Sequence, residues 1–269
     1  MNKILITGCN GQLGTELGKL LPNAIKTDYQ QLDITNADAV KQFVSKNQID
    51  TIINCAAYTA VDKAEDDIAL SEKININGPW NLAMTGAKII HISTDYVFDG
   101  KADRPYIEFD EVNPQGAYGK TKLAGENMVR EFADKYYIVR TAWLYGDGKN
   151  FVKTMLRLSE TNDTVRVVAD QFGTPTSADE LAKAICYLIP TDNYGIFHGT
   201  CEGSCSWADF TEEIFRIKGL STKVDHITTA EYPTPAKRPA YSVLENYMLK
   251  LTGDYMFADW KEAIKEYLD

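Results

Sequence analysis

The sequence has few cysteines and histidines, no long apolar run and a deficit of positive charge. It contains five cysteines and three histidines, and Cys201 and Cys205 have no second pair that would complete a zinc site. We therefore expect free thiols in a reducing cytoplasm. No stretch approaches about 18 apolar residues, and the N-terminal apolar run is too short for a signal peptide, so we expect a soluble, cytoplasmic protein. The net charge of −10 argues against non-specific binding to nucleic acid or to an anionic membrane.

The composition that is present, with 44% hydrophobic and 25% charged residues, is typical of a globular protein. In the first 140 residues, short β-branched runs alternate with amphipathic patterns of helical period. The predicted strands are Lys3–Thr7, Ala24–Asp28, Thr51–Cys55, Lys88–Ser93 and Tyr136–Arg140, and the predicted helices are Gln12–Leu21, Ala37–Lys46, Asp66–Thr85 and Gly119–Ala133. This alternation predicts an α/β fold with a doubly wound parallel sheet of the Rossmann type, which binds ligands beyond the carboxyl ends of its strands.

After about residue 143 the pattern loosens into helices separated by loops that contain glycine and proline. The predicted helices here are Phe151–Ser159, Ala178–Leu188, Trp207–Lys218 and Ala258–Leu268. Residues 232–239 contain three prolines, which exclude a helix or a central strand. We predict a dinucleotide-binding domain over residues 1–143, to which later segments return. Residues 144–269 are predicted to form mainly a smaller, mixed, substrate-binding lobe.

A glycine-rich turn directly follows the first predicted strand and opens the first predicted helix. Its sequence is Thr7-Gly-Cys-Asn-Gly-Gln-Leu-Gly14. Gly8 and Gly11 allow a tight turn and a close approach of the backbone to a pyrophosphate, which the helix N-terminus attracts. Asp28 lies 20 residues beyond Gly8 at the end of the second predicted strand, where a carboxylate accepts hydrogen bonds from ribose hydroxyls. The segment is therefore predicted to bind a dinucleotide cofactor.

Two acidic residues bear on how this cofactor is bound. A carboxylate at Asp28 repels a 2′-phosphate, so NAD(H) is favoured, whereas the nearby Lys26 leaves NADP(H) as the alternative. Asp33, followed by Ile34, has two interpretations. Its carboxylate either accepts a hydrogen bond from the adenine amine or caps the helix that follows.

Tyr118 and Lys122 are four residues apart on a predicted helix and therefore share one face. Reduction of a carbonyl group needs a proton donor beside the path of the hydride. We expect Tyr118 to be this acid, and we expect the charge of Lys122 to lower the pKa of Tyr118 and the lysine to bind the nicotinamide ribose. Thr94, just after the fourth predicted strand, is expected to donate a hydrogen bond to the carbonyl oxygen. The predicted catalytic residues are thus Tyr118, Lys122 and Thr94.

Motifs along the whole chain resemble those of one family. The segments are Asn54–Glu65, Ser93–Phe98, Tyr118–Glu126, Arg140–Tyr145, Asn150–Leu156, Asp170–Thr176 and Tyr232–Pro239. They are similar to segments of the extended short-chain dehydrogenase/reductases and, within these, of the dTDP-4-dehydrorhamnose reductases. The resemblance implies that NAD(P)H reduces the 4-keto group of a thymidine-diphosphate deoxysugar.

The resemblance also implies roles for single residues. The implied cofactor-binding residues are Gly11, Gln12, Leu13, Asp28, Asp33, Ile34, Ala56, Ala57, Tyr58, Tyr118 and Lys122. The implied residues of the sugar pocket are Val61, Thr94, Asp95 and Trp143. Tyr96 stands where related dehydratases carry a glutamate, which disfavours the elimination of water.

The diphosphate of such a substrate needs positive charge in an acidic protein. Lys237 and Arg238 lie in the loop that prolines stiffen, and an arginine can bind phosphate through two parallel hydrogen bonds. We therefore expect Arg238 to bind the substrate. The alternative is a solvated basic loop with a surface salt bridge.

Some members of this family bind Mg²⁺ between subunits through acidic residues of the first helix and of a later loop. Glu16 matches the first group, but the later loop, Ile189–Gly195, offers only Asp192. We therefore expect no metal ion and leave the oligomeric state open between a monomer and a homodimer. Two other functions stay possible, a reductase or epimerase of another nucleotide-sugar and a non-catalytic, dinucleotide-binding regulatory subunit. The presence of both Tyr118 and Lys122 favours an enzyme.

Overall fold

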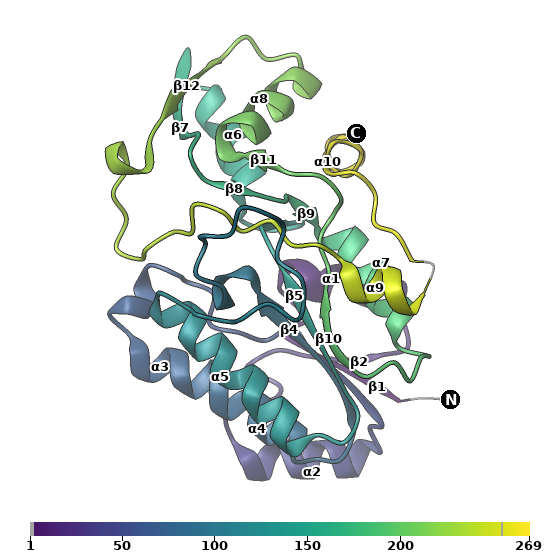
Figure 1. Cartoon of the computed structure of the whole chain (residues 1–269). Helices are drawn as coiled ribbons and strands as arrows, with labels where there is room; N and C mark the ends of the chain where they lie inside the picture. Colours follow the sequence, from purple (N-terminus) through teal and green to yellow (C-terminus); the bar gives the residue numbers. More distant parts are fainter. Residues whose placement is uncertain (1–2, 254) are drawn as a thin grey trace.

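Six parallel strands form the central sheet of the computed structural model, which describes residues 3–253 and 255–269 (Figure 1). In spatial order they are β10 (Gly195–His198), β5 (Tyr136–Thr141), β4 (Lys88–Thr94), β3 (Thr51–Asn54), β1 (Ile4–Thr7) and β2 (Ile25–Thr27). The chain reverses its direction of progress across the sheet between β1 and β3, and a parallel sheet binds ligands at such a point. The predicted fold class and the five predicted strands are confirmed.

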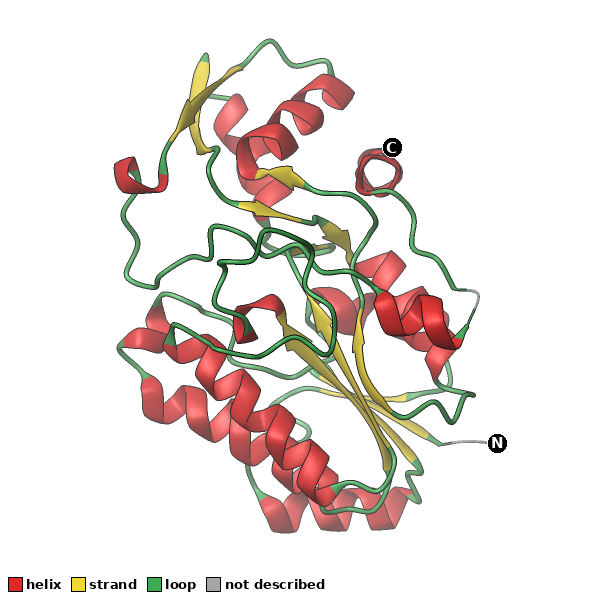
Figure 2. Ribbon diagram, viewed as in Figure 1, coloured by secondary structure: helices red, strands yellow, loops and turns green. Residues whose placement is uncertain are grey.

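Helices cover both faces of this sheet, as its uninterrupted apolar strands require. One face is covered by α1 (Gln12–Leu20) and α7 (Ala178–Leu188). The other face is covered by α2 (Ala37–Asn47), α4 (Gly78–Ala83) and α5 (Ala117–Phe132). Leu17 and Ile185 pack on the first face, and Val40 and Val129 pack on the second. Figure 2 shows the helices as layers on either side of the strands. These helices pack on the two faces of the sheet and not over the carboxyl ends of its strands (Figure 2).

The predicted helix over residues 66–85 is wrong as a single element. It is divided into α3 (Ile68–Glu72), a π-helical turn at Lys73–Asn77 and α4. Pro79 lacks an N–H group and cannot continue the hydrogen-bond ladder of α3. The preceding turn widens instead and directs the Asn75 side chain into the protein, where it is buried and binds the backbone of Tyr58.

A second layer of elements lies beyond the carboxyl ends of the strands and forms the lobe (Figure 1). It contains α6 (Phe151–Ser159), α8 (Trp207–Lys218) and α10 (Trp260–Leu268), with the strand pairs β6 (Leu144–Tyr145) and β9 (Thr176–Ser177), β7 (Thr164–Val168) and β12 (Lys223–Ile227), and β8 (Phe172–Gly173) and β11 (Cys205–Ser206). Tyr145, Phe210 and Trp260 belong to its own apolar core.

The helices of the second half begin where a side chain caps them. Asn150, Ser177 and Ser206 each accept a hydrogen bond from a backbone N–H of the first turn, and the predicted bounds of α6, α7 and α8 are confirmed. The last helix, α10, begins after its cap Asp259, two residues later than the prediction. A further short helix, α9 (Tyr247–Thr252), was not predicted.

Two elements of the second half return to the sheet. Strand β10 pairs with β5, and α7 packs against α1. The division of the chain at residue 143 stays a prediction. Among residues 3–253 and 255–269, no helix combines the length and the apolar character needed to cross a membrane.

Candidate active site

A cavity of about 1150 Å³ lies at the carboxyl ends of the strands and extends to the lobe. Most of the predicted site residues line it. They are Gly8, Gly11, Gln12, Leu13, Asp28, Asp33, Ile34, Ala56, Ala57, Val61, Thr94, Asp95, Tyr118, Lys122 and Trp143. Tyr58 and Arg238 are not among its lining residues in the described part of the chain. Residues from separate strands and helices therefore meet around one space.

The glycine turn lines the cavity at the start of α1. Gly8 has φ +64° and lies against the backbone of Ala56, where a Cβ atom would be 2.7 Å from the Ala56 nitrogen. Helix α1 follows Gly11, and no side chain of the described residues caps its first N–H groups. These unpaired donors and the positive end of the helix suit a pyrophosphate. The residues present therefore fit a dinucleotide at this position.

Asp28 lies at the end of β2 and accepts two backbone hydrogen bonds, from Tyr29 at 2.7 Å and from Asn10 at 3.2 Å. Asp33 accepts from the backbone and the hydroxyl of Thr35. The interpretation of Asp33 as a helix cap is wrong, because Asn36 caps α2 by accepting from the Ala39 nitrogen. The Asp33 side chain lies instead at the edge of the cavity.

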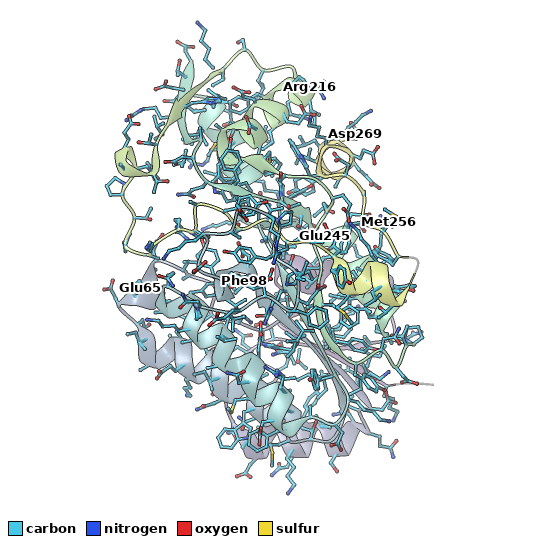
Figure 3. All side chains as sticks on the ribbon, viewed as in Figure 1. Glu65, Phe98, Arg216, Glu245, Met256 and Asp269 are labelled. Carbon is cyan, nitrogen blue, oxygen red and sulfur yellow. The ribbon has the colours of Figure 1, made fainter. Side chains whose placement is uncertain are left out.

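Asn75 joins a predicted cofactor-binding segment to α5, the helix that carries Tyr118, and sequence reasoning missed this residue. Its amide oxygen accepts from the Tyr58 nitrogen at 2.8 Å, and its amide nitrogen donates to the Tyr58 carbonyl and to the Thr121 hydroxyl. Glu65, labelled in Figure 3, accepts a hydrogen bond at 2.8 Å from the Ala117 nitrogen in the first turn of α5. The segment between β3 and α4 thus holds α5 through Glu65 and Asn75.

Helix α5 presents Tyr118 and Lys122 to the cavity, where Lys122 is buried and Tyr118 is half-buried. Burial raises the pKa of Tyr118, and the nearby Thr94 hydroxyl opposes this effect. The expected depression of the Tyr118 pKa is therefore wrong in direction, because burial outweighs the effect of its neighbours. Burial also lowers the pKa of Lys122 to about 8, which Glu126 opposes. The Lys122 ammonium donates to the Ile92 carbonyl at 2.6 Å.

Thr94 and Asp95 end β4 beside these groups. The Thr94 hydroxyl donates to the Asp95 carboxylate at 2.9 Å and accepts from the Tyr96 nitrogen. Burial raises the pKa of Asp95 to about 6, and its second oxygen has no partner among the described residues. An unpaired, buried carboxylate oxygen is costly, and a hydroxyl group of a ligand would satisfy it.

A buried ion pair below the cavity fixes the register of α5 on the sheet. The Arg140 guanidinium on β5 donates to both carboxylate oxygens of Glu126, at 3.0 and 2.7 Å. The Ser93 hydroxyl donates to the same carboxylate, and the Arg140 guanidinium lies 5.2 Å from the centre of the ring of Phe98, which is labelled in Figure 3. Because Glu126 is one turn beyond Lys122, this pair also holds a negative charge near the lysine.

Arg238 lies outside the large cavity and is already paired. It donates to the Asp62 carboxylate at 2.6 Å and to the Tyr96 hydroxyl at 3.0 Å, and the Tyr96 ring meets the Tyr118 ring edge-on at 5.5 Å. Arg238 lines a neighbouring cavity of about 140 Å³ together with Lys237. Its role in binding a diphosphate stays a prediction.

Trp143 has an unusual backbone and an unexpected neighbour. Its φ of +48° costs a bulky residue about 1–3 kcal/mol, so the surroundings must impose it. The indole stacks on Trp207, with ring centroids 3.4 Å apart and planes 6° from parallel. Trp207 also lines the cavity, and the sequence offered no signal for it beyond its aromatic character.

The acidic residues considered for a metal ion are engaged elsewhere. Glu16 pairs with Lys19 at 2.8 Å, and Asp192 accepts from the Tyr194 hydroxyl. Other acidic groups approach one another at Asp179, Glu180 and Glu266, where Lys183 pairs with the first two. Acidic groups neutralised by a lysine are poorly suited to a divalent cation.

Comparisons with known proteins match the whole chain to one family. The family described as RmlD substrate binding domain matches residues 1–269. A dTDP-4-dehydrorhamnose reductase of Aggregatibacter actinomycetemcomitans is 40% identical over 287 residues, 98% of each chain. The crystal structure of such a reductase from Clostridium acetobutylicum is 59% identical with a TM-score of 0.97, covering 99% of this chain and 98% of that one. The crystal structure of a dTDP-4-dehydrorhamnose reductase from Bacillus anthracis, in complex with NADP, is 42% identical with a TM-score of 0.97, and the match covers 100% of this chain and 99% of that one.

Proposed function

This chain belongs to the dTDP-4-dehydrorhamnose reductase family, and we propose that Tyr118, Lys122 and Thr94 carry out its reaction. The protein is an NAD(P)-dependent oxidoreductase, which reduces the 4-keto group of a dTDP-4-dehydro-deoxysugar. The observation that supports the residue roles is that these three side chains line one cavity together with the uncapped glycine turn.

The residues of the chain supply the proton and the electrostatic environment for this reduction. When bound, the reduced nicotinamide supplies the hydride that the carbonyl carbon accepts. Tyr118 donates its hydroxyl proton to the carbonyl oxygen, so the ketone becomes an alcohol. The raised pKa keeps Tyr118 protonated until this transfer, and the charge of Lys122 then stabilises the phenolate that remains. Thr94 donates a hydrogen bond to the same oxygen once it releases Asp95.

Specificity is proposed to come from residues at the two ends of the cavity. Asp28 favours NADH over NADPH because its carboxylate repels a 2′-phosphate, with NADPH as the alternative cofactor. Asp95, Val61 and Trp143 surround the sugar, and the unpaired oxygen of Asp95 accepts from one of its hydroxyls. Arg238 binds the diphosphate after leaving Asp62. Cytoplasmic localisation fits the free cysteines.

The experiment that tests this proposal is the substitution Tyr118→Phe. It removes the proton donor and leaves the ring in place. With a dTDP-4-keto sugar and NADH, kcat should fall by roughly 10² or more. The KM for NADH should change little, because Lys122 and the glycine turn remain. As a control, Tyr187→Phe alters a tyrosine that does not line the cavity and should keep wild-type activity. Near-full activity of Tyr118→Phe would contradict the proposed role of the phenol.

A further inference from the structure

The loop after β5 holds Trp143 in a backbone conformation that a tryptophan does not adopt by itself. Its φ of +48° lies in the left-handed region, which disfavours bulky side chains. The Trp143 carbonyl accepts a hydrogen bond from the Thr176 nitrogen, and the chain then enters β6, which pairs with β9. Strain of this kind persists where surrounding contacts impose it, and it is frequent where a ligand binds.

Two contacts impose the position of the Trp143 indole. The Trp207 ring lies parallel to it at 3.4 Å, a face-to-face arrangement that two free aromatic rings avoid. The backbone of Gly173 lies against the same indole, and a Cβ atom there would be 2.6 Å from the indole nitrogen. The indole can therefore occupy its site only while position 173 has no side chain.

The two contacts belong to one rigid unit of the lobe. Gly173 on β8 pairs with Cys205 on β11, and β11 leads directly into α8, whose first residue is Trp207. Ser206 caps this helix through a capping box with Asp209, which fixes the direction in which Trp207 leaves the backbone. We call Gly173, Trp207 and the β8–β11 pair the indole clamp.

We propose that the indole clamp positions Trp143 as a preformed wall of the sugar pocket, with Trp207 and Gly173 acting as positioning residues. This inference rests on the proposed function, in which the 4-keto sugar lies beside Trp143. Both tryptophans line the cavity that contains Thr94 and Tyr118. A wall that is already in place before binding orients the sugar carbonyl toward the phenol without an ordering cost at each turnover.

The test uses Gly173→Ala, which keeps both tryptophans and inserts a methyl group against the Trp143 indole. Trp207→Leu removes the stacking partner, and Trp207→Phe retains an aromatic face. The matched control is Gly18→Ala on α1, where an added Cβ atom meets the flexible end of Lys26. Two closely stacked indoles give an exciton-coupled signal in far-ultraviolet circular dichroism, and this signal is measured alongside kcat and KM for the sugar and for NADH.

We expect Gly173→Ala to lose the exciton signal and to lower kcat/KM for the keto-sugar roughly tenfold or more, with KM for NADH unchanged. Trp207→Leu should lower kcat/KM for the keto-sugar by a similar factor, and Trp207→Phe should retain part of the lost kcat/KM. Gly18→Ala should have the kcat/KM of the wild type. Unchanged sugar kinetics in Gly173→Ala, or equal losses for sugar and NADH, would overturn the inference. An inactive wild type would overturn the proposed function as well, whereas an active wild type with unaffected variants would overturn the indole clamp alone.

Discussion

The burial of Lys122 makes the free energy of unfolding depend on pH, and the size of the effect follows from its pKa. In the folded protein, burial lowers the pKa of Lys122 from 10.5 to about 8, while Glu126 acts in the opposite direction. Unfolding returns the lysine to water and to a pKa of about 10.4. The fall of the pKa from about 10.4 in the unfolded chain to about 8 in the folded protein corresponds to ~3 kcal/mol. The charged lysine therefore opposes folding by about this amount below pH 8.

The direction of the effect is set by which state binds the proton. Between about pH 8 and pH 10.4, the unfolded chain keeps the Lys122 proton and the folded protein releases it. Because the unfolded state then binds more protons, the free energy of unfolding rises with pH by about 1.4 kcal/mol per unit. Below about pH 8 both states hold the proton, so the contribution of Lys122 is constant.

Urea unfolding of the wild type and of Lys122→Met, measured from about pH 7 to pH 10, isolates this contribution. Methionine fills similar space without a titrating group. The wild-type minus variant difference should be level up to about pH 8 and then increase by ~2–3 kcal/mol by pH 10. The control Lys120→Met, at an exposed position of the same helix, should show no such increase. Parallel curves for wild type and Lys122→Met would refute the reasoning, because they would mean that Lys122 titrates alike in both states.

Three further outcomes are expected of the purified enzyme. The wild type should use NADH more efficiently than NADPH, and Asp28→Ala should narrow or reverse that preference by removing like-charge repulsion; a wild type that prefers NADPH several-fold would show that Asp28 does not act on the ribose. Arg238→Ala should raise the KM for the nucleotide-sugar tenfold or more, about 1.4 kcal/mol, with KM for NADH unchanged; equal losses for both ligands would point to disruption of the Asp62 ion pair and its loop. Activity should survive EDTA, because phenol and lysine supply the chemistry, and inactivation that Mg²⁺ reverses would count against a metal-independent reaction.

Most of the sheet could be predicted because strands buried on both faces leave continuous apolar runs in the sequence. The short strands of the lobe could not, since a pair such as Phe172–Gly173 with Cys205–Ser206 has too few residues for any period to show. The predicted helix over residues 66–85 was too long because its apolar spacing continues through Pro79. That spacing does not reveal the π-helical turn, which depends on the buried hydrogen bonds of Asn75.

In the site, the parts that lie close together in the sequence were the predictable ones. The glycine turn is contiguous, and Tyr118 and Lys122 are one helical turn apart. The Arg238–Asp62 ion pair joins residues 176 positions apart, and its existence depends on how the lobe packs on the sheet. Trp207 reaches the cavity for the same reason. The pKa of Tyr118 was expected in the wrong direction because its sequence neighbours reveal its charges but not its burial.

The return of α7 and β10 to the sheet decides how this chain can be divided for expression. A fragment that ends after β5 contains the glycine turn and Tyr118, yet it lacks the helix whose Leu181 and Ile185 belong to the same core cluster as Ile6. It also lacks Phe197, which packs 5.6 Å from the Tyr137 ring. These core side chains would face water, and β5 would become an open edge on which further copies can add strands. The cofactor-binding half is thus an aggregation-prone fragment on its own, so swapping the lobe between relatives requires that α7 and β10 stay with the sheet.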